Sequence, residues 1–173
     1  LEENWDAVRE AQVQRAGLRL EGDLHTAYEL AGRLAEAAAS GAAGSQEEAF
    51  AALARAVPRR GIESGLAILD SSGHPWAWAG RHRLAPTGLG HPVATVQNPF
   101  YLALEVSREA GMGRRAVGTV LVWADSIVPD RARSVTEDFR ARSGVGLRVY
   151  PAGSAPEGAD LFEYSEPTTE CDR

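Results

Sequence analysis

The sequence lacks several features that would assign a function directly. It contains no lysine, so all 18 positions counted as Lys or Arg are arginine, and Gly88 and Gly90 are not followed by the glycine and lysine of a phosphate-binding loop. Cys171 is the only cysteine, so no disulfide forms within the chain, and cysteine usage does not indicate the redox compartment. The longest apolar run, residues 116–124, has about half the length that a membrane-spanning helix requires.

The chain also lacks a cluster of positive charge. Its formal net charge is −6, and no basic stripe with interleaved aromatic residues occurs, which argues against nucleic-acid binding. Of its 173 residues, 44% are hydrophobic and 24% are charged, a composition typical of a globular chain rather than a disordered one. The length lies within the usual range of a single domain.

No metal site is predicted. The candidate ligands His74, His82 and His91 are eight and nine residues apart, whereas zinc sites favour short pairs such as H-x₃₋₅-H or C-x₂₋₄-C. His74 directly precedes Pro75 in a predicted turn, where a solvated ring is the usual outcome. The sequence therefore predicts no metal and no cofactor.

No catalytic residues are predicted either. The G-x-S-x-G nucleophile elbow is missing. Residues 70–72 lie close to His74, but a turn favours these residue types for backbone reasons alone. The carboxylates of Glu105, Glu109 and Asp125 are isolated in the sequence and form no pair placed for acid–base work. We therefore expect no enzyme activity in this domain.

The N-terminal part, residues 1–57, is predicted to be helical. Residues 2–40 form one long helix, because apolar side chains recur at spacings of three, four and seven. A second helix begins after a capping box of Ser45 and Glu48 and ends at Pro58. The long helix carries a narrow stripe that would suit packing on the chain's own sheet or on a second copy, and we expect a homodimer seam there. The stripe consists of Val13, Leu20, Ala27 and Leu34.

Residues 63–150 are predicted to contain the sheet, and residues 151–173 a polar tail. Strands are expected on both sides of a turn at residues 70–73, and alternating apolar positions predict further strands. The connection over residues 84–98 shows no strong periodicity. A helix beginning near Pro129 and closed by Gly144 or Gly146 follows the longest strand. The expected strands are 65–70, 75–80, 100–107, 115–125 and 146–150, with 160–164 a candidate final edge strand.

These elements predict an α+β fold in which a long N-terminal helix packs on a central antiparallel sheet of about five strands. Their order resembles the extracytoplasmic PAS-like sensor domains of bacterial membrane receptors, the Cache group. The signature of that group is a long membrane-proximal helix, a strand ending in a D-x-x-G hairpin, and a later strand reading G-x-V-x-V-x-x-D before a helix. The matching segments are residues 2–40, 68–73 and 118–125.

The resemblance implies a ligand site between the concave face of the sheet and the loop that joins its second and third strands. That loop is residues 81–98 here, and Val117, Thr119, Leu121 and Trp123 share a strand face if the period of two holds. Arginine side chains suit the carboxylate of a small anionic ligand, and aromatic side chains suit its apolar part. The other interpretation makes all of them ordinary sheet and surface residues. The candidate ligand-binding residues are Trp78, Arg81, Arg83, Tyr101, Arg115 and Trp123.

The function implied by the resemblance is signal sensing. We expect residues 1–173 to form one extracytoplasmic (periplasmic) sensor domain of an inner-membrane receptor, with a two-component histidine kinase as its output. A ligand or partner would favour one of two packings of the domain, and the long helix would transmit the change. Because the chain begins with Leu1 rather than Met, we expect a fragment of a longer protein. A cytoplasmic PAS- or GAF-like regulatory module and a small enzyme are the alternatives.

Overall fold

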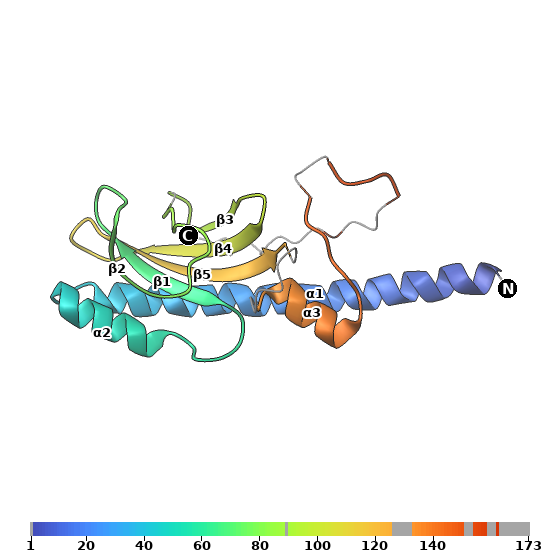
Figure 1. The fold of residues 1–173 in the computed structure, drawn as a ribbon, viewed down its shortest axis with the longest axis horizontal. Coiled ribbons are helices and arrows are strands. Elements are labelled where there is room, and N and C mark those ends of the chain that lie inside the picture. The colour runs from blue at the N-terminus through green and yellow to red at the C-terminus, as the bar shows by residue number, and fades with distance from the viewer. Residues whose placement is uncertain (1, 89, 126–132, 151–153, 159–161, 163–173) are drawn as a thin grey trace, which may run out of the picture.

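The computed structural model describes residues 2–88, 90–125, 133–150, 154–158 and 162, and shows an α+β architecture (Figure 1). A long N-terminal helix packs along one face of a five-stranded antiparallel sheet, as the sequence predicted. Two shorter helices lie beside the long helix, on the same side of the sheet. The other face of the sheet carries the loops, and the functional argument concerns that face.

Helix α1 (Glu2–Gly41) forms the base of the molecule and ends one residue after the predicted boundary. Its C-terminal part is buried against the sheet, with Ala27, Ala31 and Ala35 at 1%, 0% and 0% exposure. Forty residues of α-helix are about 60 Å long, so the N-terminal part extends past the sheet (Figure 1). Among the described residues no helix is both long and apolar enough to cross a membrane.

The predicted dimer stripe on α1 is mostly used inside the chain. Leu20, Ala27 and Leu34 are 6%, 1% and 3% exposed, because they face the sheet and α3 side of the helix. Only Val13, at 40% exposure, remains available. Three of the four residues of the predicted dimer stripe therefore cannot contact a second copy, because a side chain already buried within its own chain has no surface left for a partner.

Both shorter helices are capped as local sequence predicts. Helix α2 (Gln46–Ala56) begins with the Ser45 capping box, in which the Ser45 side chain accepts from the Glu48 amide and the Glu48 carboxylate accepts from the Ser45 amide. Helix α3 (Val135–Ser143) is capped by Ser134 and closed by Gly144 in the left-handed conformation. The predicted start at Pro129 lies outside the described residues.

The sheet contains β1 (Ser64–Leu69), β2 (Pro75–Gly80), β3 (Val93–Gln97), β4 (Tyr101–Glu109) and β5 (Arg115–Ala124), in the order β2-β1-β5-β4-β3. The predicted turn between β1 and β2 is present, because the Asp70 carboxylate accepts from the backbone amides of Ser72 and His74 at 2.8 and 2.9 Å. Gly73 has φ +81°, which glycine adopts without strain.

Two strand predictions differ from the structure. β3 lies inside the connection that showed no periodicity, because five residues between glycine- and proline-rich segments give too short a pattern. Residues 146–150 form neither helix nor strand, so that prediction was wrong. Their alternation fits a strand, but a strand also needs a neighbouring strand to pair with, and β3 supplies the fifth strand instead. Residues 160–164 lie outside the described residues except Phe162, which is in no strand.

The central strand β5 touches the backbone of α1 directly. A Cβ added to Gly118 would collide with the carbonyl oxygen of Ala31 and would lie 2.7 Å from the amide nitrogen of Ala35. Only glycine permits this approach of strand to helix. The contact fixes the position of β5 along α1, so the sheet and the long helix form one packed unit.

Candidate functional site

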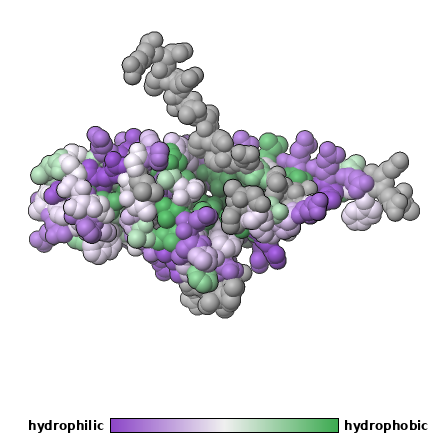
Figure 2. Space-filling view, turned by 90° about the horizontal axis from the view of Figure 1, so that it is seen from above, coloured by the Kyte–Doolittle hydropathy of each residue, from purple (hydrophilic) through white to green (hydrophobic). Residues whose placement is uncertain are grey.

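The loop after β2 lies across the sheet face that points away from α1. We call residues 81–88 the strap. Its first residue continues the hairpin, since the Arg81 amide donates to the Ser64 carbonyl at 3.0 Å. Its last residue packs on the other end of the same face, where a Cβ on Gly88 would lie 2.7 Å from Leu69 and 3.6 Å from Val117. Seen from this side, the molecule shows hydrophobic side chains near its middle among hydrophilic ones (Figure 2).

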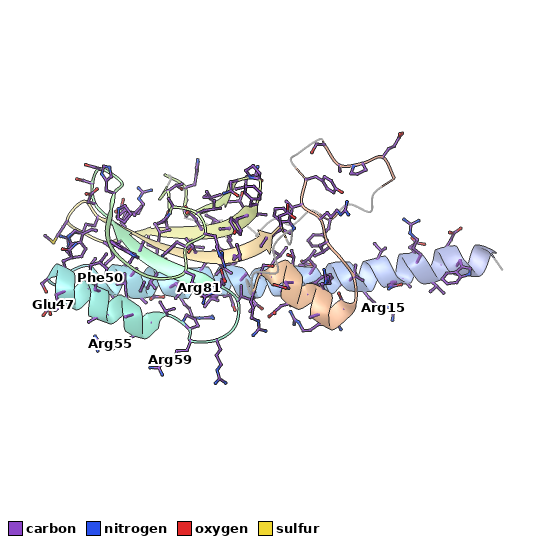
Figure 3. The ribbon with its side chains drawn as sticks, viewed as in Figure 1. Arg15, Glu47, Phe50, Arg55, Arg59 and Arg81 are labelled. Atoms are coloured by element: carbon purple, nitrogen blue, oxygen red, sulfur yellow. The ribbon has the colours of Figure 1, made fainter. Side chains whose placement is uncertain are left out.

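The first attachment of the strap is a three-residue ion pair around Glu63. The Arg83 guanidinium donates from Nε and Nη2 to the two carboxylate oxygens at 2.8 and 3.0 Å, and Arg81 Nη1 donates at 3.0 Å. The Glu63 and Arg83 side chains are 6% and 22% exposed, whereas that of Arg81 is 69% exposed (Figure 3). Hydrogen bonds from Arg83, then those from Arg81 and both positive charges, hold the pKa of Glu63 below its usual value against the effect of burial.

Glu63 also connects the strap to other elements. Its carbonyl accepts from the Leu121 amide of β5 at 2.9 Å, and its amide donates to the Arg133 carbonyl at 2.7 Å, just before α3. Helix α3 is joined to α1 by the ion pair between Arg142 and Asp23 at 2.8 Å. Glu63 is therefore bonded to the strap, to β5 and to the residue before α3, and α3 is in turn bonded to the long helix.

The second attachment is His82. Its ring lies over Gly65, where a Cβ would be 2.6 Å from Cε1 and Nε2, so the strap needs glycine at this position of β1. Its Nδ1 lies 3.2 Å from the Thr119 hydroxyl oxygen, and Thr119 is 6% exposed. Nε2 is buried and has no hydrogen-bond partner among the described residues.

The third attachment is Glu105, which is 3% exposed. Its carboxylate accepts from the Thr87 hydroxyl at 2.8 Å and from the Thr87 amide at 3.1 Å. Glu105 lies opposite Thr119 in the β4–β5 register, so it shares a face with Thr119 and lies near His82. The polar groups of His82, Thr119 and Glu105 therefore lie together between strap and sheet, beside the apolar cluster of Ala67, Leu69 and Val117.

A cleft opens at the end of the strap. It has a volume of about 440 Å³ and lies between the β1–β2 turn, the residues Thr87, Gly88 and Gly90, and the β4–β5 turn. Arg115 is half-buried in its wall and donates from Nη1 to the Gly88 carbonyl at 2.8 Å. Neighbouring Arg114 donates instead to Ala42 and stacks on Trp76, with 3.6 Å from Cζ to the ring centroid. Both arginines line the cleft, but the Arg114 guanidinium is held by Ala42 and Trp76, so Arg115 is the candidate for ligand binding.

The structure does not bring the three candidate arginines together. Arg81 and Arg83 bind Glu63 beside Ser64, which pairs with Val120, whereas Arg115 pairs with Leu69. Five residues of an antiparallel strand separate these two pairs, roughly 17 Å. A clamp of all three on one carboxylate is therefore wrong, and the carboxylate between Arg81 and Arg83 belongs to the protein.

The aromatic candidates also separate. Tyr101 faces the strap side, with the Arg83 guanidinium 5.5 Å from its ring centroid. A register shift in β4–β5 pairs Leu121 with Ala103 but Trp123 with Leu102. Adjacent residues of a strand point to opposite faces, so Trp123 does not share the face of Leu121. The period-of-two prediction fails at this irregularity, which sequence alone does not reveal.

Trp78, the remaining candidate, lies on the edge strand β2 and is 50% exposed. Its ring meets Phe50 of α2 edge to face, with 5.1 Å between centroids. It therefore contacts α2, and it is not one of the residues that line the cleft beside Arg115.

Sequence reasoning missed Glu63, although this residue had a signal, and it named Glu105 without predicting its contact with the loop after β2. Glu63 directly precedes β1 and Arg81 directly follows β2, and in a hairpin such residues are neighbours whatever the rest of the fold. Glu105 had no such signal, because its partner Thr87 comes from an irregular loop. Within the described part of the chain no group of three or more His, Cys, Asp or Glu side chains is placed to hold a metal ion.

Comparisons with known proteins return nothing for this chain: no family model, curated protein or solved structure matches it.

Proposed function

We propose that the chain is the signal-sensing domain of a bacterial membrane receptor, an extracytoplasmic domain of the PAS-like, Cache type. The proposal rests on the resemblance of its segments and on the α+β fold, in which a long helix supports the sheet and extends beyond it. The parent protein is proposed to be anchored in the inner membrane. Its output, on the resemblance alone, is proposed to be a histidine kinase.

One observation carries the proposal. Arg115, in the cleft wall, begins the strand whose fourth residue, Gly118, touches the backbone of α1. The distance from ligand cleft to output helix is therefore three residues of one central strand. A ligand that moves Arg115 changes the packing of β5 on α1, and differential contacts of about 1–3 kcal/mol are typical of such coupling.

The ligand class follows from the cleft. Arg115 uses one nitrogen on Gly88 and faces a space that the Asp70 and Glu109 side chains border from two turns. A guanidinium recognises carboxylates and other oxyanions through paired N–H donors. We therefore propose a small anionic ligand at Arg115, in place of the wider site that the sequence suggested.

Self-association is proposed to use the part of α1 that extends past the sheet. Trp5, Val8 and Leu18 are 73%, 50% and 70% exposed there, and Arg15 lies on the same extension (Figure 3). In a receptor, tethering to a membrane raises the effective concentration of the two helices. Sedimentation of the chain at high concentration, beside its Leu18→Glu variant, tests this contact: a dimer that the substitution leaves intact contradicts it.

The receptor proposal is tested by the gene sequence on both sides of this coding region. We expect an apolar segment of about 20 residues in frame shortly before α1, and a second one after the domain. A cytosolic enzyme or nucleic-acid-binding domain joined directly to either end, with no apolar segment, contradicts the proposal.

The ligand site is tested separately by thermal shift of the isolated chain with a panel of carboxylates and other small anions. Any anion that raises the melting temperature of the native chain should raise that of Arg115→Ala by less. It should raise that of Arg108→Ala by as much as in the native chain, because Arg108 is an exposed arginine on the neighbouring strand. A stabilising anion whose effect ignores Arg115→Ala places the site elsewhere.

A further inference from the structure

His82 is the one histidine of the chain that is wedged between the strap and the sheet. Its ring fills the space above Gly65, and the strap on either side of it is attached by Arg81 and Arg83 to Glu63. By contrast His74 has an 80% exposed side chain, and His25 and His91 are exposed. A change at His82 alone therefore acts on the contact between strap and sheet.

The hydrogen bonds around His82 suit a neutral ring. The Thr119 hydroxyl lies 3.3 Å from the Gly65 carbonyl, which only accepts, so the single hydroxyl proton goes to Gly65. The same oxygen then accepts from Nδ1–H of His82, and this network assigns the proton of the neutral ring to Nδ1. Nε2 keeps a lone pair with no partner in the described surroundings.

Protonation changes this arrangement. The imidazolium has a second N–H, at Nε2, which has no hydrogen-bond partner in the described surroundings. Burying this donor is costly, although the Leu66 and Ala79 carbonyls near the ring favour the charged form. The charged groups facing the ring are Glu105 of β4 and, beside the ring in the strap, Arg81 and Arg83 with Glu63. Of these, Glu105 favours the cation, but its carboxylate is directed to Thr87 and makes no hydrogen bond to the ring.

We propose that His82 makes the attachment of the strap to the sheet sensitive to acid: the neutral ring holds the strap on the sheet, and protonation of the ring releases it. The strap then leaves the face that carries Glu105 and Thr119 and uncovers the side of the cleft formed by Thr87 and Gly88. Closing of the strap is thus coupled to the loss of one proton. This inference concerns the isolated chain and does not depend on the receptor proposal.

The direction of the pKa shift agrees with this proposal. Burial lowers the pKa of His82 from its ordinary value of 6.5, and outweighs the carbonyl groups of Leu66 and Ala79 and the charge of Glu105, which act the other way. A histidine with a lowered pKa in the closed state binds its proton more readily in the open state. The stability that it gives to the closed strap is therefore complete above about pH 6.5 and is lost as the pH falls below that value.

Hydrogen exchange of the isolated chain, corrected for the intrinsic pH dependence of exchange, tests the proposal between about pH 7.5 and pH 5.5. The reporters are the Arg81 and Thr87 amides, which donate to Ser64 and Glu105. We expect their protection to fall by up to about tenfold, the limit for one proton over the unit below the ordinary histidine value. The amides of β1 that pair with β5 should keep their protection from hydrogen exchange over the same pH range.

Two variants separate this cause from others. His82→Gln carries no titrating group, so its strap should show the same protection at both pH values, while His74→Gln should behave as the native chain does. If His82→Gln fails to fold, NMR titration of the His82 ring in the native chain decides. A ring that titrates at or above about 6.5, or strap protection that does not change with pH, overturns the proposal.

Discussion

The two faces of the sheet are buried by different chemistry. The face toward α1 is closed by small apolar groups, with the α1 backbone in direct contact with Gly118. The face under the strap buries Glu105 and Thr119 beside an apolar cluster of Ala67, Leu69 and Val117, and is joined at its margin to Glu63. The side chains buried between the sheet and the helices include Leu53, Leu66, Ile68, Ala116 and Val120.

This difference separates a part of the molecule that binds no proton or anion from a part that does. Apolar packing varies little with proton or anion concentration, so the helix face changes its geometry only when β5 or the strap passes a displacement to it. Ion pairs and buried hydrogen bonds depend on both, because a proton or a competing anion changes the partner directly. We therefore expect substitutions on the helix face to change the free energy of unfolding, and substitutions on the strap face to change how the chain responds to acid and to anions.

The largest effect is expected for Gly118→Ala. The added methyl group would collide with Ala31 of α1, and neither backbone moves without shifting the core, so the free energy of unfolding should fall by about 3 kcal/mol or more. Gly22→Ala is the matched control: nothing lies within 4 Å of its added Cβ, and on an exposed helix position it should stabilise by about 0.5–1 kcal/mol. Equal chemical-denaturation curves for the two variants contradict the close contact.

Glu63→Gln should give the next largest loss, about 2 kcal/mol at neutral pH, because it removes the negative charge that accepts two hydrogen bonds from the mostly buried Arg83. The control is Glu29→Gln, whose ion pair with Arg33 is exposed on both sides and should contribute less than about 0.5 kcal/mol. Since arginine contacts lower the pKa of Glu63, its contribution is complete above its usual value of 4.5 and is lost as pH falls below it. Urea denaturation at neutral and acid pH should show the gap between native and variant chains closing on acidification.

The smallest effect is expected for the combined Ser72→Ala and His74→Ala substitutions. The β1–β2 turn uses the backbone amides of these residues and the carboxylate of Asp70, so the double variant should change stability by less than about 0.5 kcal/mol. Asp70→Ala should lower the melting temperature more than the double variant does. Loss of a hydrolytic activity in the double variant would show that these side chains do chemistry.

Local signals in the sequence determine most of the fold. The capping box at Ser45, the turn at Asp70 and the alternation along β4 each depend on neighbouring residues, and each is found where it was predicted. The sequence predicted a strand over residues 146–150 and none at β3, whereas the structure has the reverse, because strand pairing is not a local property. Trp123 was assigned to the wrong face because a register shift has no clear signature in sequence.

The candidate site was less predictable than the fold. The sequence indicated which arginines and which loop to consider, but not that Glu63 already binds two of the arginines. Long side chains of opposite charge choose partners after the backbone has brought distant segments together. Arg115 was distinguished from Arg81 and Arg83 only by its position at the opposite end of the strand pair.

The difference between the two faces is tested most directly by distances between paired spin labels at about pH 7.5 and pH 5.5, in a Cys171→Ser background. One pair reports the strap, from Ala85→Cys to Glu36→Cys on α1, and the other reports the helix side, from Ala51→Cys on α2 to the same α1 position; all three positions are exposed. We predict that acid broadens and shifts the strap distances while the α2 distances stay unchanged. Strap distances that are unchanged in acid, or both pairs changing together, would contradict an acid-responsive strap beside a helix face that acid itself does not change.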